Sequence, residues 1–172
     1  MKHKAKWAAL MGMSVALAMI FSYVEVLLPP FFAAVPGIKI GLANVVIIFV
    51  LFRYGALQAA TVSFLRVFLV FLLFGNALSL AYSAAGAALS LLLMVLLKKT
   101  QLFSAVAVSA VGGIAHNAGQ ILMAVFLLGV AEIGYYLTVL AVTGCVFGAL
   151  VGALGALAVR RVPRLPFERE LS

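Results

Sequence analysis

Residues 36–44 read Pro-Gly-Ile-Lys-Ile-Gly-Leu-Ala-Asn, a polar and flexible stretch near the start of an otherwise apolar chain. Pro has no backbone N–H to donate and Gly tolerates unusual dihedral angles, so this stretch interrupts a regular helix. Lys39 and Asn44 bring polar side chains to the same break. In a membrane, irregular backbone and charge are tolerated only where protein or a water-filled cavity covers them. The stretch therefore predicts the beginning of a binding site.

The composition around this break is that of an integral membrane protein. Of the 172 residues, 67% are hydrophobic and only 9% are charged, and the mean hydropathy is +1.29. The pattern predicts an all-α polytopic membrane protein with six transmembrane helices in one domain, residues 1–172. The six segments run at about 7–28, 38–52, 57–74, 77–97, 102–128 and 133–159, and a short basic tail follows at 160–172. The second segment is short for a span, so tilt, local thinning or an unwound start must accommodate it.

The distribution of basic residues predicts the orientation. With a cytoplasmic N-terminus, Lys39 is the one basic residue on the outer side, and Arg66 lies inside the membrane. The cytoplasmic side then holds Lys2, Lys4, Lys6, Arg53, Lys98, Lys99, Arg160, Arg161, Arg164 and Arg169. We therefore expect a multi-pass protein of the bacterial plasma membrane with both termini in the cytoplasm.

Polar side chains within the segments gather in the outer half of this topology. Arg66 lies inside the third segment, and the fifth places His116, Asn117 and Gln120 on one broad helix face by their spacing of three and four. Arginine can bind a carboxylate or phosphate through two parallel hydrogen bonds. We predict a site that captures a small anionic or polar-headed molecule. Its candidate residues are Lys39, Asn44, Arg66, His116, Asn117, Gln120 and Glu25, the last holding Arg66 when the site is empty.

Each of these residues also has a purely structural interpretation. Arg66 can pair with Glu25 as a bridge between helices, because a charge at the middle of a membrane helix costs ~2.5 to 3.5 kcal/mol and seeks a partner. The polar residues of the fifth segment can instead form hydrogen bonds between helices, worth ~1 kcal/mol each. The residues alone leave both interpretations open.

Small residues form two stripes at helical spacing, on segments one and six. Such stripes let helices approach closely. The stripe on segment one is a candidate docking face for another membrane subunit, and the stripe on segment six is interpreted as packing within the bundle. The first consists of Ala8, Gly12 and Ala16, and the second of Gly144, Gly148, Gly152 and Gly155.

Several kinds of chemistry are disfavoured because the chain lacks the residues and motifs that they require. It has no aspartate, whereas polyprenyl diphosphate synthesis needs magnesium held by clustered carboxylates. Its single Cys145 cannot form a cysteine-based cluster. There is no G-x-x-x-x-G-K-[ST] phosphate loop. We therefore expect a protein that is not an enzyme and that has neither a metal site nor a cofactor.

Four motifs together resemble a known family. They are residues 36–44, Phe-Leu-Arg-Val at 64–67, Phe-Gly-Asn at 74–76 and Ala-His-Asn-Ala-Gly-Gln at 115–120. The chain resembles the Gx transporter family, also labelled heptaprenyl diphosphate synthase component I. Members are similar to the substrate-binding subunits of energy-coupling-factor transporters, which capture vitamins or related molecules and rely on separate ATPase and scaffold subunits.

The resemblance implies partner subunits but does not identify the ligand. It also implies a role for the stripe on segment one, because those subunits meet their scaffold through small residues of the first helix. The alternative is a non-catalytic membrane component that serves prenyl diphosphate or quinone metabolism, or a flavin- or quinone-linked redox system.

Overall fold

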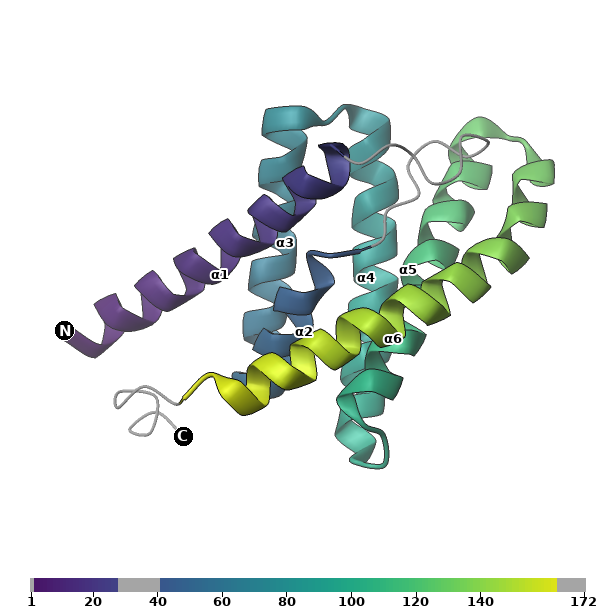
Figure 1. The fold of residues 1–172 in the computed structure, drawn as a ribbon. Helices are drawn as coiled ribbons and strands as arrows, with labels where there is room; N and C mark the ends of the chain where they lie inside the picture. Colours follow the sequence, from purple (N-terminus) through teal and green to yellow (C-terminus); the bar gives the residue numbers. More distant parts are fainter. Residues whose placement is uncertain (1, 28–40, 164–172) are drawn as a thin grey trace.

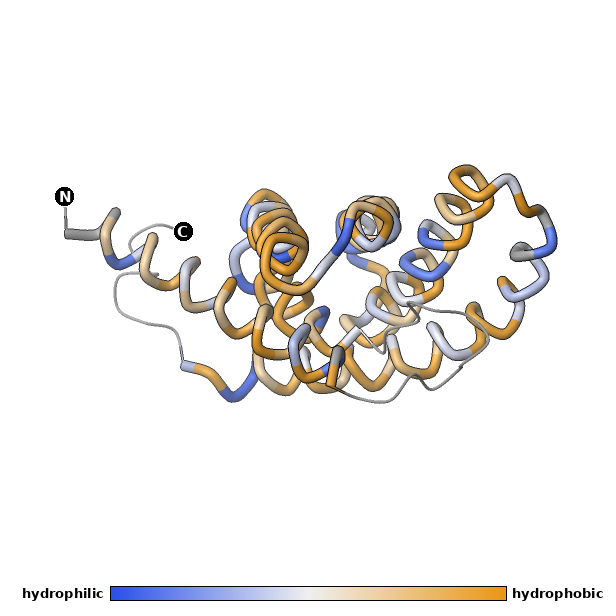
Figure 2. The backbone as a smooth tube through the Cα atoms, turned by 90° about the horizontal axis from the view of Figure 1, so that it is seen from above, coloured by the Kyte–Doolittle hydropathy of each residue, from blue (hydrophilic) through white to orange (hydrophobic). Residues whose placement is uncertain are grey.

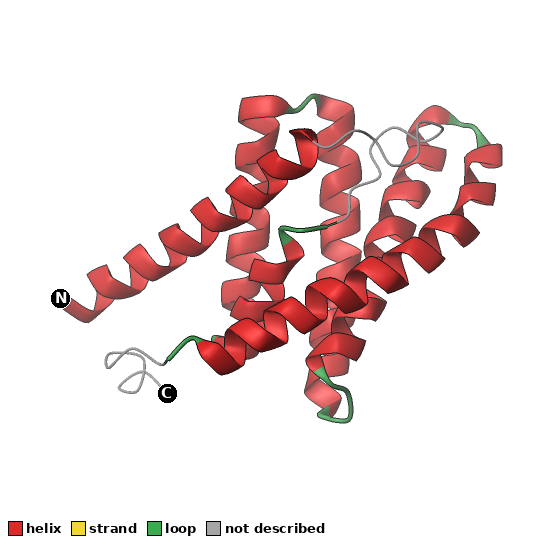
Figure 3. Ribbon diagram, in the orientation of Figure 1, coloured by secondary structure: helices red, strands yellow, loops and turns green. Residues whose placement is uncertain are grey.

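The structure of the chain is a computed structural model that describes residues 2–27 and 41–163. Over these residues the chain forms six α-helices, a short 3₁₀-helix and no strand, and short loops join the last five α-helices (Figure 3). The helices are α1 (Lys2–Leu27), α2 (Asn44–Arg53), α3 (Ala56–Phe74), α4 (Ala77–Thr100), α5 (Ala105–Leu128) and α6 (Leu137–Arg161), with the 3₁₀-helix η1 (Ala131–Tyr136) before α6. The prediction of an all-helical bundle with six helices is confirmed. Lys39, most of the predicted break, Arg164 and Arg169 lie outside the described residues.

Five of the six helices are long and apolar enough to cross a membrane. Hydrophobic residues occur along the length of these helices (Figure 2). Many of their large apolar side chains, such as Leu72, Leu122 and Phe126, are exposed. Exposed apolar side chains at this density are expected where a helix surface meets lipid. The chain is therefore a multi-pass membrane protein.

The exception is α2, which at 10 residues is about 15 Å long and cannot cross a ~30 Å hydrocarbon core alone. The prediction placed this helix at 38–52, but it begins only at Asn44. The preceding turn runs through Gly41, whose φ of +82° favours glycine, and the Asn44 N–H donates to the Gly41 carbonyl at 2.8 Å. At the other end, Gly55 has a φ of +111° and separates α2 from α3.

The short helix α2 lies at the centre of the core. Its side chains Ile47, Ile48, Val50 and Leu51 are almost completely buried, and α2 packs against α1, α3, α5 and α6. It begins part of the way between the two ends of the bundle, as Figure 1 shows. A helix end is thereby brought into the interior of the protein.

Basic side chains fasten the opposite end of α2. The Lys98 ammonium donates to the Leu51 carbonyl and lies 5.3 Å from the centre of the Phe52 ring. Arg53 donates from Nη1 to the Val159 carbonyl of α6 at 3.4 Å. Cations near the last carbonyls of a helix satisfy those acceptors and complement the helix dipole. These contacts tie α2 to α4 and α6 at the end that carries most of the described basic residues.

The tightest packing in the bundle joins α5 to α6 and α4. A Cβ atom on Gly113 would lie 2.1 Å from the Gly144 carbonyl oxygen, and one on Gly119 would lie 2.7 Å from the Ala85 carbonyl oxygen. Such distances leave room only for glycine. Gly144, Gly148 and Gly152 face α5 in the same way, and Gly155 faces Ile48 of α2. The interpretation of the stripe on segment six as internal packing is confirmed.

Candidate ligand-binding pocket

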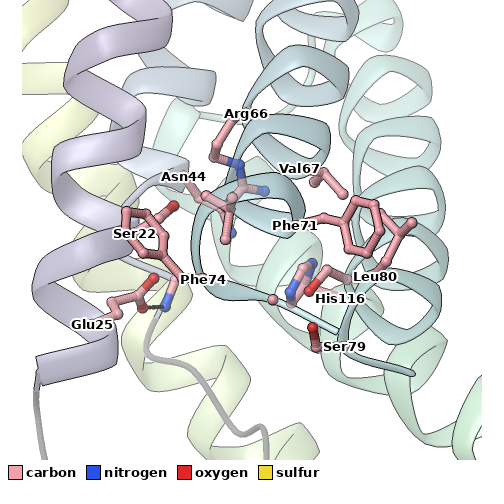
Figure 4. A pocket seen from close by; sticks show the side chains of 14 residues that line it. Ser22, Glu25, Asn44, Arg66, Val67, Phe71, Phe74, Ser79, Leu80 and His116 are labelled. Atoms are coloured by element: carbon pink, nitrogen blue, oxygen red, sulfur yellow. Dashed lines mark hydrogen bonds between the residues drawn. The ribbon is translucent and has the colours of Figure 1, made fainter. Parts of the chain in front are cut away.

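A pocket of about 110 Å³ lies where five segments of the bundle meet. This is well above the ~10–15 Å³ that a single water requires. Figure 4 shows the pocket with Ser22 and Glu25 on one side, His116, Ser79 and Leu80 on the other, and Arg66 and Asn44 between them. The lining residues are Ser22, Glu25, Gly41, Asn44, Arg66, Val67, Val70, Phe71, Phe74, Gly75, Ser79, Leu80, Ser83 and His116. Of the seven residues predicted for the site, four therefore line one pocket.

Glu25, near the end of α1, binds the turn that precedes α2. Its Oε1 accepts hydrogen bonds from the Gly41 N–H and from the Leu42 N–H, the latter at 3.0 Å. Two successive backbone N–H groups in front of a helix form a natural position for an anion. A carboxylate from elsewhere in the chain occupies that position here.

Arg66 lies in the middle of α3, where neighbouring apolar side chains such as Phe64 and Phe68 are exposed on the outside of the bundle. Its side chain is only 9% exposed and lines the pocket. The Glu25 carboxylate interacts electrostatically with the guanidinium, and the Arg66 Nε has no hydrogen-bond partner among the described residues. A buried donor without a partner costs roughly 1–3 kcal/mol, so this nitrogen favours an additional acceptor in the pocket.

His116 reaches the pocket from α5 because α4 approaches very closely at this level. A Cβ atom on Gly86 would lie 2.7 Å from the His116 carbonyl oxygen and 3.0 Å from its Nδ1. The imidazole is 7% exposed and is held between the two helices. Gly86 is thus a positioning residue for the site that the sequence did not single out.

The part of the pocket wall that α3 contributes beyond Arg66 is apolar. Val67, Val70, Phe71 and Phe74 extend along α3 from Arg66 toward the turn to α4. The Phe74 ring also packs on Tyr23 of α1, with ring centres 5.2 Å apart. The pocket therefore offers a polar end at Arg66 and Glu25 and an apolar side along α3, as an amphiphilic molecule requires.

Two predicted site residues do not line the pocket. The Asn117 side chain donates from Nδ2 to the Leu140 carbonyl of α6 at 2.7 Å, and Gln120 packs its side chain toward Gly86 of α4. On a helix, residues one position apart point about 100° away from each other, so His116 and Asn117 serve different neighbours. Asn117 forms the kind of bond between helices that the structural interpretation anticipated. Lys39 lies outside the described residues.

Sequence reasoning predicted the turn that begins α4, but it assigned neither this turn nor the serines of the pocket to the site. Asn76 caps this helix: its side chain accepts from the Ser79 N–H at 2.9 Å, and the Asn76 N–H donates to the Ser79 hydroxyl at 2.9 Å. An Asn-x-x-Ser pattern before an apolar run is a recognisable helix-start signal. Ser22 and Ser83 carry no comparable signal in the sequence.

These features define a class: a helical multi-pass membrane protein with a partly polar pocket inside the bundle. The comparison with protein families is more specific, since a family model described as heptaprenyl diphosphate synthase component I matches residues 14–158. The chain belongs to this family. No match was found among curated proteins or among solved structures.

Proposed function

We propose that this protein is a non-catalytic membrane subunit that captures a small molecule with an anionic or polar head in the pocket between α1, α3 and α5. The observation that carries the proposal is Arg66: this buried residue in the middle of α3 lines a cavity, and its Nε has no hydrogen-bond partner among the described residues. Ionisable groups inside a membrane protein are costly and typically mark a binding or transport path. Asn44 and His116 line the same cavity and would orient the ligand, and Glu25 would hold Arg66 in place when the cavity is empty. Lys39 stays a predicted donor to the anionic head, and Asn117 and Gln120 stay predicted to fix the orientation of the ligand.

The partner subunits belong to the same proposal. The sequence has no nucleotide-binding loop, so energy for transport would come from separate ATPase and scaffold subunits. In this reading the protein takes its ligand from the outside and passes it inward, as the substrate-binding subunits of energy-coupling-factor transporters do.

The family match favours a second candidate, a component of a prenyl diphosphate synthase. The family description makes its members one component of such an enzyme, which implies a partner subunit. The chain has no aspartate with which to hold magnesium, so the partner would supply the catalysis. A prenyl diphosphate has an anionic head and an apolar tail, and both ends of the pocket suit it.

Mass spectrometry of the protein purified in mild detergent distinguishes the two candidates. A vitamin-like polar molecule released on denaturation supports transport, whereas a prenyl diphosphate or quinone supports the second candidate. Release from the wild type but not from an Arg66→Met protein locates the molecule in this pocket. A molecule that co-purifies equally with both proteins would place binding elsewhere.

The orientation of the chain is proposed from the charge asymmetry. Arg53, Lys98, Lys99, Arg160 and Arg161 cluster where α2, α4 and α6 end, and we assign this side to the cytoplasm of a bacterial plasma membrane. In a Cys145→Ala background, a cysteine replacing Glu132 should react with an impermeant reagent added to intact cells. A cysteine replacing Lys99 should not react. The reverse pattern would invert the assignment.

The stripe of Ala8, Gly12 and Ala16 is proposed as the docking face for a membrane partner. All three residues are exposed on α1, and a Cβ atom on Gly12 would meet nothing within 4 Å. Gly12→Leu should therefore abolish co-purification of the partner, because a bulky side chain blocks close helix contact, while ligand binding and the thermal midpoint stay unchanged. Leu17→Ala, on another exposed part of α1, is the control. Undiminished co-purification of Gly12→Leu would rule out this face.

A further inference from the structure

We propose that the Glu25 carboxylate occupies the position of the ligand's own anionic group, and that an amphiphilic acid binds by exchanging its carboxylate or phosphate for that of Glu25. This inference rests on the proposed function, since it specifies how the pocket recognises its ligand. It names the ligand class as one anionic head joined directly to an apolar part.

The first support is the shape of the anion position. The N–H groups of Gly41 and Leu42 converge on one oxygen, Oε1 of Glu25, in front of α2. The left-handed conformation of Gly41 produces this turn, and a Cβ atom there would lie 3.0 Å from the Asn44 Nδ2. Paired backbone donors at a helix start bind any anion of suitable size, so the arrangement is not specific to the side chain that fills it.

The second support is the donor capacity of Arg66. A guanidinium has five N–H donors in a planar fork, and here the Nε stays without a partner although the side chain is buried beside Glu25. An arrangement built only to join two helices would be expected to satisfy this donor. A ligand anion that reached both the turn and Arg66 would satisfy it and gain charge-assisted hydrogen bonds.

The third support is the continuation of the cavity along α3. Beyond Arg66 the lining becomes apolar at Val67, Val70 and Phe71. A free inorganic anion would leave these side chains without a contact. An acid with an apolar tail would cover them, and each buried CH₂ group is worth ~0.8 kcal/mol.

If Glu25 only supported ligand binding, removing its charge would lower the ligand affinity. The exchange predicts the opposite, a higher affinity. Glu25→Gln keeps an oxygen that accepts from the Gly41 and Leu42 N–H groups, but it removes the competing charge. The variant should bind geranyl diphosphate at least about tenfold more tightly than the wild type, because a neutral acceptor is displaced at lower cost. Glu132→Gln removes the same charge from an exposed position and should leave the affinity unchanged.

The experiment is isothermal titration of each protein in lipid nanodiscs with geranyl diphosphate, inorganic pyrophosphate and geraniol. In the ¹⁵N-labelled wild type, the Gly41 and Leu42 amide resonances should shift on titration with geranyl diphosphate and not with geraniol. Pyrophosphate should bind at least about tenfold more weakly than geranyl diphosphate. Equal affinities for the two would show that the pocket does not recognise the apolar part of the ligand.

The titrations distinguish failure of the exchange from failure of the proposed function. If the wild type binds geranyl diphosphate, Arg66→Met does not, and Glu25→Gln binds no better than the wild type, the exchange is wrong and the proposed function stands. If neither the wild type nor Glu25→Gln binds either anion while both keep their thermal midpoints, the anionic ligand itself is wrong, and the inference falls with it.

Discussion

Replacing Arg66 by Met should lower ligand affinity by roughly tenfold to a hundredfold. The lost charge-assisted hydrogen bonds contribute ~1.5 to 3 kcal/mol each. Arg66→Met should also lower the thermal midpoint, because the buried Glu25 carboxylate then loses its electrostatic interaction with the guanidinium. The measurements are affinity for the co-purified molecule and the thermal midpoint in the same detergent.

The double variant Arg66→Met, Glu25→Gln separates binding from stability. Removing both charges should restore the thermal midpoint that Arg66→Met alone loses, since no uncompensated charge remains. Its affinity should stay roughly tenfold to a hundredfold below that of Glu25→Gln alone. A stable double variant that binds as tightly as Glu25→Gln would show that Arg66 holds helices together and touches no ligand.

Gly113→Ala should destabilise the bundle by about 2–3 kcal/mol. The new methyl group would lie 2.1 Å from the Gly144 carbonyl oxygen, and a backbone atom cannot rotate away as a side chain can. The helices α5 and α6 would have to separate along their most extensive contact. Overpacking of this kind typically costs 1–3 kcal/mol. Denaturant titration or a thermal scan in detergent measures the loss.

Gly12→Ala is the matched control for this substitution. It adds the same methyl group to a helical glycine, but nothing lies within 4 Å of the new atom. Alanine favours helix over glycine by ~1 kcal/mol, so the control should be neutral or slightly stabilising. Equal losses in the two variants would mean that backbone flexibility, and not the α5–α6 contact, dominates the response.

Much of the fold was predictable because hydrophobicity in a membrane protein is arranged in long, separate blocks. The segments at 57–74 and 77–97 correspond closely to α3 and α4, where the Phe-Gly-Asn motif interrupts helix propagation. The start of α2 was not predictable to the residue. Ile40 and Leu42 are apolar enough to belong to a helix, and the left-handed conformation of Gly41 depends on contacts with α1 that a local pattern does not contain.

The site was predictable where a residue is costly in its surroundings. Arg66 and Glu25 are charges among apolar residues, so they need a cavity or a partner, and both line the pocket. It was harder to predict which polar side chains of α5 line the pocket, because one broad helix face contacts two different neighbours. A rotation of about 100° between His116 and Asn117 is enough to turn one side chain to the pocket and the other to Leu140.

The position of α2 also implies that the transmembrane voltage would affect the binding of a charged ligand. Helix α2 begins inside the bundle (Figure 1), and Arg66 and His116 lie in the middle of α3 and α5. If α3 and α5 cross the membrane along their length, an anion bound beside Arg66 would lie roughly half of the way across the hydrophobic layer and would have crossed roughly half of any transmembrane voltage. At about 100 mV a full crossing is worth ~2.3 kcal/mol per charge, so half is about 1.2 kcal/mol, or roughly sevenfold in affinity. Binding of a charged ligand from one side of an energised membrane therefore differs from binding to the same protein in detergent.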